Sequence, residues 1–327
     1  VISLYGNYIP TAKFQGSASL FMRSNNESIG LSARLQGAGN HFYWKASGTF
    51  IDYADYKVPT GSIQYYSYDI PLHDRRLRNT AGFEHDGSMT FGYRSHNFHT
   101  ELKLSDAYSK SGFFANAHGL EVRLSDIDYD RSRRDIDLPC QSVNHLRVMS
   151  HTVYEQGSLA LEADLAYQNN HRKELSEPVS HGYMPVPPGS LEREFKKDTY
   201  TANLIARLSL GSRHTLTAGF NSEYQHNRRS GWGFIMPDFE TASFGTYAFD
   251  RFTVRKDLIL NAGVRYDHVR TSIHSYKDWF KTPVSATDSV FKERSEDLRR
   301  SFNSLTWSAG VNYSVGQWIL KANVGKS

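Results

Sequence analysis

The sequence SFNSLTWSAGVNYSVGQWILKANVGKS, residues Ser301–Ser327, contains the clearest strand pattern of the chain. Apolar and polar residues alternate in it on both sides of a turn at Val315–Gly316. The apolar positions are Leu305, Trp307, Ala309, Val311 and Tyr313 before the turn, and Trp318, Leu320, Ala322 and Val324 after it. Successive side chains of a strand point to opposite faces, so each half forms a strand with one apolar and one polar face. The stretch predicts two antiparallel strands joined by a tight turn.

The same alternation recurs along the whole chain and predicts about fourteen strands. We expect them at residues 2–9, 16–24, 28–36, 41–51, 79–95, 98–108, 143–154, 158–168, 199–210, 214–225, 244–254 and 258–270, with two more within 301–327. From residue 37 onward, short and long connections between these strands alternate. The long ones are 52–78, 109–142, 169–198, 226–243 and 271–300. In a meander every second connection lies on the same edge, so all the long loops are expected on one rim, as in outer-membrane barrels.

Composition agrees with a membrane barrel and excludes several other classes. The chain has 327 residues and a mean hydropathy of −0.56, and it contains no apolar run long enough for a membrane-spanning helix. A transmembrane β-barrel has the same low hydropathy because every second residue of its strands is polar. The net charge of +4 is nearly balanced, which argues against nucleic acid as a partner. A single cysteine, Cys140, excludes an internal disulfide.

The position of charged residues decides which face meets lipid. In a wide barrel the polar face borders a wet or plugged lumen, while the apolar face meets acyl chains. The opposite arrangement would place Lys45, Arg147, Glu162, Asp164, Arg207, Glu223, Arg265 and Lys321 in hydrocarbon. Basic residues at the bilayer midplane cost about 2–4 kcal/mol each. We therefore predict an all-β fold, an antiparallel up-and-down transmembrane β-barrel with outer-membrane lipid around it.

Several motifs resemble those of one protein family. AGVNYSVGQWILKANVGKS (Ala309–Ser327) and LNAGVRYDH (Leu260–His268), which follows FGTYAFDRFTVRKD (Phe244–Asp257), resemble paired strands of TonB-dependent outer-membrane receptors of Bacteroidetes-type bacteria. RHTLTAGFNSEYQHNR (Arg213–Arg228) and FQGSASLFMRSNN (Phe14–Asn26) are similar to the same receptors. The resemblance covers essentially the whole chain, although Phe249 stands where the family commonly has glutamine.

The resemblance implies a receptor in the bacterial outer membrane that takes up a scarce nutrient with energy supplied by the TonB complex. An iron chelate or siderophore is the first candidate ligand, and haem, cobalamin or a glycan are the others. Barrels of this family have roughly 22 strands. We therefore expect residues 1–327 to be a partial, monomeric barrel, about 14 strands of the roughly 22, that lacks the N-terminal plug domain and the closing C-terminal strands. TonB would act through that missing plug.

Two other classes of function remain open at this stage. One is a passive porin or an outer-membrane assembly barrel. The other is a soluble β-sheet binding or adhesion module. An enzyme is not expected, because the chain has no GxSxG, HExxH or GxxxxGK[ST] motif, and no cofactor is expected either.

Arginines and aromatic residues of the long loops are the candidates for ligand contact, because binding residues concentrate on loops held by a rigid scaffold. The candidates are Tyr183, Arg228, Arg229, Trp232, Phe234, Tyr276 and Trp279. The competing interpretation is that these side chains only pack against neighbouring loops.

No metal site is predicted. His145 and His151 lie on the same polar face of one expected strand, but about 20 Å apart, so they cannot share an ion. Asp126, Asp128 and Asp130 resemble the start of a calcium loop. Arg131 stands where that loop needs glycine, so a solvated loop is the better interpretation.

Overall fold

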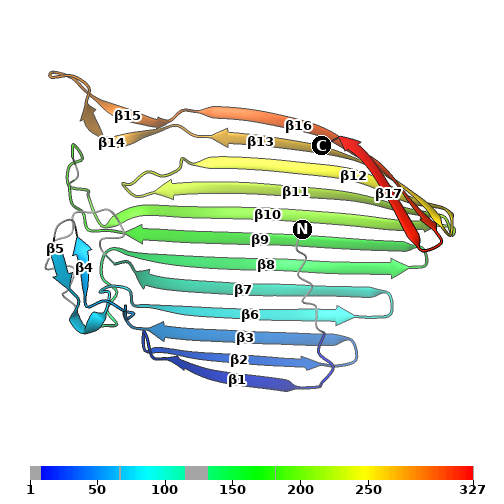
Figure 1. Ribbon diagram of the computed structural model, residues 1–327, viewed down its shortest axis with the longest axis horizontal. Helices are drawn as coiled ribbons and strands as arrows, with labels where there is room; N and C mark the ends of the chain where they lie inside the picture. Colours follow the sequence, from blue (N-terminus) through cyan, green and yellow to red (C-terminus); the bar gives the residue numbers. More distant parts are fainter. Residues whose placement is uncertain (1–8, 66–67, 115–131, 181, 327) are drawn as a thin grey trace.

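Thirteen strands form one antiparallel sheet in which each strand pairs with its neighbours in chain order (Figure 1). The structure is a computed structural model that describes residues 9–65, 68–114, 132–180 and 182–326. The strands of the sheet are β1 (Gln15–Arg23), β2 (Ser28–Ala38), β3 (Phe42–Tyr53), β6 (Gly82–Arg94), β7 (Phe98–Gly112), β8 (Cys140–Gln156), β9 (Leu159–Leu175), β10 (Leu191–Leu210), β11 (His214–Ser230), β12 (Phe239–Arg255), β13 (Leu258–Ile273), β16 (Leu298–Val315) and β17 (Trp318–Lys326). The predicted all-β, up-and-down architecture is confirmed.

Two small hairpins lie in the long connections. They are β4 (Ser62–Tyr65) with β5 (Tyr68–Pro71), and β14 (Tyr276–Pro283) with β15 (Ser289–Ser295). A single 3₁₀ turn, His73–Arg75, follows β5. In the part of the chain that the structure describes, no helix is long and apolar enough to cross a membrane. The expected strand at residues 2–9 and the aspartates 126, 128 and 130 fall outside the described residues, apart from Ile9.

The strands are longer than the sequence predicted, and the long loops are correspondingly shorter. β10 begins at Leu191 instead of residue 199, and β11 ends at Ser230 instead of residue 225. The expected loops 169–198 and 226–243 therefore shorten to 176–190 and 231–238. Alternation of apolar and polar side chains stops where both faces meet water, but backbone pairing does not depend on it. About 9–11 residues cross a bilayer, so strands of 17 to 20 residues extend well beyond one side.

From residue 37 onward, short and long connections are sorted onto opposite rims, as predicted, while the short β1–β2 turn lies on the same rim as the long ones. The tight turns 39–41, 95–97, 157–158, 211–213, 256–257 and 316–317 all lie at the right of Figure 1. The long connections 54–81, 113–139, 176–190, 231–238 and 274–297 begin and end at its left. Gly157, Gly211 and Gly316 have φ near +60° in three of the tight turns, a conformation that favours glycine. We call the two ends of the sheet the short-turn rim and the long-loop rim.

One face of the sheet is apolar and uncovered. Leu104, Leu165, Leu204, Phe220 and Val264 all lie on it and remain exposed. Among the described residues the buried apolar side chains are only Tyr43, Ala54, Ile70, Leu72, Ala81, Cys140 and the prolines Pro10, Pro139 and Pro187. No second layer of described protein therefore packs against this face, which is what a face in contact with lipid requires.

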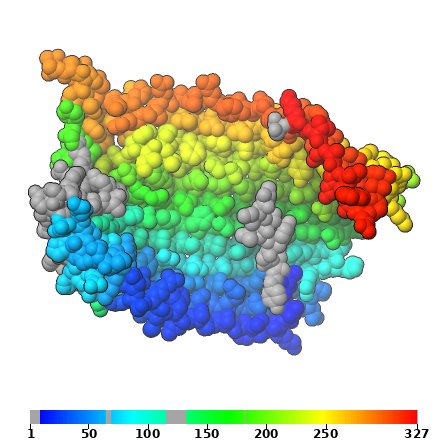
Figure 2. Space-filling view, in the orientation of Figure 1, coloured from blue at the N-terminus to red at the C-terminus, as the bar shows by residue number. Residues whose placement is uncertain are grey.

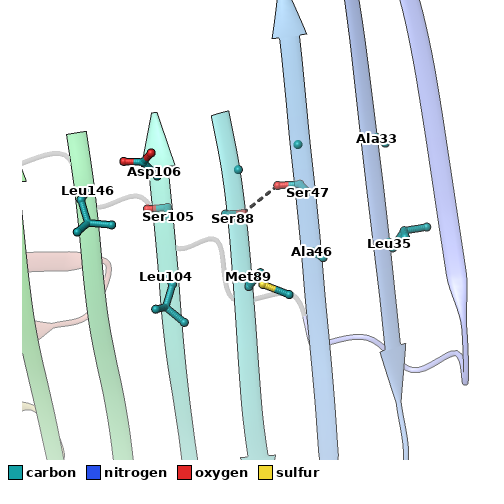
Figure 3. Close-up of a pocket in the computed structure, with 12 residues that line it drawn as sticks. Ala33, Leu35, Ala46, Ser47, Ser88, Met89, Leu104, Ser105, Asp106 and Leu146 are labelled. Atoms are coloured by element: carbon teal, nitrogen blue, oxygen red, sulfur yellow. Dashed lines mark hydrogen bonds between the residues drawn. The ribbon is translucent and has the colours of Figure 1, made fainter. Parts of the chain in front are cut away.

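A shallow groove marks this outward face across β2, β3, β6, β7 and β8 (Figure 3). Its volume is about 470 Å³. Small residues form the floor, and Leu35, Met89, Leu104 and Leu146 stand around it. Ala33, Gly48 and Gly87 are direct cross-strand neighbours, so three small residues in one row produce the depression.

Aromatic side chains form two rows on the outward face. Towards the long-loop rim, Tyr167, Tyr200 and Tyr224 are cross-strand neighbours with ring centroids 5.0 and 6.3 Å apart. Towards the short-turn rim, the Tyr93 ring lies 5.0 Å from Phe42 and 6.2 Å from Phe98. Such paired girdles mark the two interfaces of a transmembrane barrel. The segment between the rows, centred near Leu204 in β10, is the part within hydrocarbon.

A polar clamp holds the first long connection at the long-loop rim. Asp55, which is 1% exposed, accepts hydrogen bonds on one carboxylate oxygen from the backbone N–H groups of Thr80 (2.6 Å) and Ala81 (2.9 Å). The buried Arg76 donates to the Asp55 carbonyl oxygen and, at 2.6 Å, to the carboxylate of Glu27 in the β1–β2 turn. These contacts close the 54–81 connection at its base and join it to the neighbouring turn.

An arginine placed on the outward face should destabilise the barrel, and one on the opposite face should not. We expect Leu204→Arg to lower the free energy of unfolding by about 2–4 kcal/mol, because the charge enters hydrocarbon. Asn203→Arg, one residue away and facing the lumen, is the matched control. Urea unfolding of the full receptor in lipid vesicles measures both, and equal losses would contradict the assignment of the faces.

Removing the Asp55 carboxylate should loosen the 54–81 connection. Asp55→Ala leaves the buried N–H groups of Thr80 and Ala81 without an acceptor, a loss of about 1–3 kcal/mol for each group. We expect faster proteolysis of this connection on intact cells. Asp69→Ala, at an exposed residue of the same connection, should leave the cleavage rate unchanged. The clamp would be disproved by identical cleavage rates in the two variants.

Candidate functional site

An arginine and two aromatic rings from different connections meet at the long-loop rim. The rings of Phe234 and Tyr276 stack with centroids 4.8 Å apart and planes inclined by 2°. The guanidinium carbon of Arg229 lies 4.0 Å from the centre of the Tyr276 ring and 5.9 Å from that of Phe234. Arg229 is the next-to-last residue of β11, Phe234 belongs to the 231–238 loop, and Tyr276 opens β14. We call these three residues the rim cluster.

Hydrogen bonds fix the arginine of the rim cluster in place. Its Nη2 donates to the carbonyl oxygens of Gly231 (2.7 Å) and Gly233 (3.1 Å), and its backbone N–H donates to the Asp238 carboxylate at 2.5 Å. Its Nε and Nη1 groups donate to no described residue. Within the described chain, no carboxylate forms an ion pair with its guanidinium. Arg229 therefore presents a positive charge and two groups of N–H donors in a fixed position.

The 231–238 loop is also tied to the connection before β10. Trp232 donates its indole N–H to the Gly189 carbonyl oxygen at 3.0 Å. The backbone N–H of Gly233 donates to the Glu192 carbonyl oxygen at 2.7 Å. At Gly231, φ is +87° and a Cβ atom would lie 2.4 Å from that same carbonyl oxygen, so only glycine fits. Three long connections, 176–190, 231–238 and 274–297, are thus linked.

The other candidates lie apart from the rim cluster. Arg228 belongs to β11 and not to a loop, and alternation places it on the outward face, where it lies 4.0 Å from the Asp198 carboxylate. Trp279 packs edge-on against Phe280, with ring centroids 5.4 Å apart. Tyr183 is 70% exposed in the 176–190 connection. The structure thus brings together Arg229, Phe234 and Tyr276, and Trp232 lies in the same loop as Phe234.

An ion pair that the sequence analysis missed holds the hairpin that carries Tyr276. The Nε of Arg294 in β15 lies 2.9 Å from both carboxylate oxygens of Asp278 in β14. The Nη2 of Arg294 lies 2.8 Å from Oδ2 of the same carboxylate. Hydrogen bonding to this carboxylate raises the pKa of Arg294. Figure 2 shows the hairpin projecting beyond the end of the sheet, in orange at the upper left. The pair could not be found from periodicity, because the strand register shifts between the two residues.

A second polar group supports the strands behind the rim cluster. Glu194 in β10 lies beyond the aromatic row, outside the hydrocarbon segment, and accepts hydrogen bonds from Ser230 and from His171 at 2.7 Å. Burial alone would raise the pKa of its carboxyl, but these hydrogen bonds and the charge of Lys196 lower the pKa to about 2. Glu194 therefore stays ionised at physiological pH and joins β9, β10 and β11.

Comparison with known proteins gives a family match over nearly the whole chain. The model described as "TonB dependent receptor-like, beta-barrel" matches residues 4–327. No curated protein matches. Solved structures share the fold at low identity, and the chain spans about half the length of each.

Three of these structures illustrate the similarity. The FrpB iron transporter from Neisseria meningitidis (F3-3 variant) has a TM-score of 0.60 and 14% identity over 95% of this chain and 44% of its own. The copper transporter OprC has a TM-score of 0.62 and 11% identity over 96% and 45%. The ferric-catecholate import receptor Fiu from E. coli K12, in its open form, has a TM-score of 0.56 and 11% identity over 95% and 53%.

The exposed apolar face, the aromatic girdles and the sorted connections are those of a barrel wall in the bacterial outer membrane. The family match covers the same strands. The chain therefore belongs to the TonB-dependent receptor family, to whose β-barrel its residues 4–327 correspond.

Proposed function

We propose that this chain forms barrel wall in a receptor that takes up an anionic iron chelate of the siderophore type, with energy supplied by TonB. The observation that carries the proposal is the rim cluster. Its guanidinium has no ion-pair partner among the described residues, and two aromatic rings lie beside it. A ferric chelate with negatively charged oxygens accepts hydrogen bonds from a guanidinium, and planar ligand groups pack on aromatic faces.

The names of two of the three similar structures agree with iron as the cargo, and the third names copper. FrpB is described as an iron transporter, Fiu as a ferric-catecholate import receptor and OprC as a copper transporter. At 11–14% identity these structures show the fold alone. The proposal about which nutrient this chain takes up is therefore based on the rim cluster. Among the other nutrients implied by the family, a neutral glycan fits an uncompensated arginine least well.

Arg229, Phe234 and Tyr276 are the proposed contact residues, and Trp232 is a proposed supporting residue because its indole N–H is already bound to Gly189. Tyr183 and Trp279 stay weaker candidates. Arg228 faces outward beyond the aromatic row, where lipid headgroups are nearer than any ligand in the lumen. The sequence raised two interpretations of these side chains, ligand contact and packing between loops, and this assignment combines them. Phe234 and Tyr276 pack against each other, and the guanidinium of Arg229 beside them stays available to a ligand.

The rest of the transport cycle is proposed from the family. A plug domain inside the barrel would contact the polar face, and TonB would pull on that plug from the other side of the membrane. The family favours such active uptake by a monomeric barrel over a passive porin or an assembly barrel. The uncovered apolar face argues against a soluble adhesion module. The relatives are transporters and receptors, so we propose that the chain is not an enzyme.

Loss of the rim arginine should weaken ligand binding without changing surface abundance. We expect Arg229→Ala to raise the Kd for ferric tris-catecholate or ferric citrate about 10- to 100-fold, because a charge-assisted hydrogen bond contributes about 1.5–3 kcal/mol. Arg228→Ala, the adjacent arginine on the outward face, is the matched control. Binding to intact cells, normalised by antibody to surface receptor, gives both values. Equal Kd values in the two variants would remove Arg229 from the site.

Uptake should depend on energy although surface binding does not. We expect cells that express the full receptor to accumulate radioactive iron from the same chelates, and to stop when TonB is deleted or the proton gradient is dissipated. Chelate bound at the surface should stay the same in both treatments. Continued accumulation without TonB would indicate passive diffusion and contradict the proposal.

A further inference from the structure

A histidine and two carboxylates converge on the lumen face of β8 and β9, near the short-turn rim. His151 and Asp164 are direct cross-strand partners, and Glu162 lies two residues from Asp164, so all three share one face. The Nδ1 of His151 lies 2.6 Å from a carboxylate oxygen of Asp164. One ligand atom from each of the three residues lies within 4.8 Å of the others. The group is far from the rim cluster, at the opposite end of the strands.

Neighbouring polar side chains extend this group across β7. The His99 ring lies edge-on to that of His151 with centroids 6.0 Å apart, and Glu101 is the cross-strand partner of His151. The Tyr43 hydroxyl donates to Glu101 at 2.7 Å and is hydrogen-bonded to His99 at 2.8 Å. Two imidazoles and three carboxylates therefore gather on three adjacent strands, and the contacts of Tyr43 hold His99 and Glu101 beside the central group.

The two central carboxylates have no lysine or arginine partner among the described residues. Within the described chain, Asp164 has His151 as its ion-pair partner, and Glu162 forms no hydrogen bond or ion pair. No described lysine or arginine forms an ion pair with either. A neutral imidazole leaves two negative charges close together, and like charges at this distance repel each other. A divalent cation held by both carboxylates would remove that repulsion.

We propose that His151, Glu162 and Asp164 bind a divalent transition-metal ion, with Zn²⁺ as the best-fitting one. Imidazole favours Zn²⁺ over Mg²⁺ and Ca²⁺, which prefer oxygen ligands alone. Donor atoms around a tetrahedral Zn²⁺ lie roughly 3.3 Å apart, so atoms that are already within 4.8 Å need only small side-chain rotations. The Nδ1 lone pair and one oxygen from each carboxylate form the bonds to the ion. The one N–H proton of the neutral imidazole then sits on Nε2, so Nδ1 binds the ion with the ring still neutral.

Three protein ligands leave the fourth position of the ion open to the lumen. Side-chain exposures of 25% for His151 and 42% for Asp164 make the site accessible from that side. Water or a donor atom from another molecule or segment fits there. The inference does not depend on the nutrient proposed above, because it uses other residues at the other rim.

The test is metal titration of the full receptor purified in detergent and stripped with a chelator. We expect Zn²⁺ to bind at one site per chain in calorimetry, and Co²⁺ at the same site to give the visible absorption of a tetrahedral ion. His151→Ala should abolish this binding, and Glu162→Gln or Asp164→Asn should weaken it at least tenfold.

His145→Ala is the matched control, because His145 is another lumen-facing histidine of β8 about 20 Å from His151. It should bind Zn²⁺ like the unaltered receptor. Heat-modifiable migration of each variant on a gel shows that the barrel has folded. The proposal is overturned if the folded receptor shows no saturable Zn²⁺ binding, or if folded His151→Ala binds Zn²⁺ unchanged.

Discussion

The backbone hydrogen-bond ladder holds this sheet together in a solvent that offers its polar groups no partner. In hydrocarbon each backbone N–H and C=O group must find a partner within the protein, and a continuous antiparallel sheet provides one. Here the ladder runs from β1 to β17 without a crossover. The described residues bury few apolar side chains, so no internal core stabilises the sheet. Its outward leucines, alanines and aromatic rings are removed from water only when lipid covers them.

That arrangement gives the long connections a rigid base. Strands of 17 to 20 residues continue past the outer aromatic row, so the rim cluster stands on paired backbone and not on a free loop. Arg229 is the clearest case, because it is still paired with Phe195 of β10 while its side chain reaches the 231–238 loop. A guanidinium already fixed by two carbonyl oxygens and a tyrosine face loses little further conformational freedom when a ligand binds.

Much of the sheet could be predicted from the sequence, because alternation of residues such as Leu204 and Asn203 reports directly on burial in lipid. The strand ends could not be predicted in this way, because around Glu194 and Lys197 both faces of the sheet carry polar residues. The alternation of apolar and polar residues is therefore lost there. The meeting of the rim cluster residues could not be predicted for another reason: Arg229 and Tyr276 come together only through the conformation of the 231–238 loop and the position of the β14–β15 hairpin, which no periodicity encodes. The outward position of Arg228, in contrast, could have been predicted from the sequence. Continuing the alternation from Tyr224 places it on the apolar side.

In the proposed receptor, the three linked connections determine whether a bound ligand would move the rim. Tyr276 joins the β14–β15 hairpin to Arg229 at the end of β11. Trp232 joins the 231–238 loop, which follows β11, to Gly189. A ligand that binds the free N–H groups of Arg229 competes with none of these contacts, so it adds to an ordered rim. A ligand that takes the face of Tyr276 must displace the guanidinium and loosen the hairpin from the 231–238 loop. Only the second mode converts binding into movement, so capture is rigid when the ligand binds the N–H groups of Arg229 and coupled to motion when it takes the face of Tyr276.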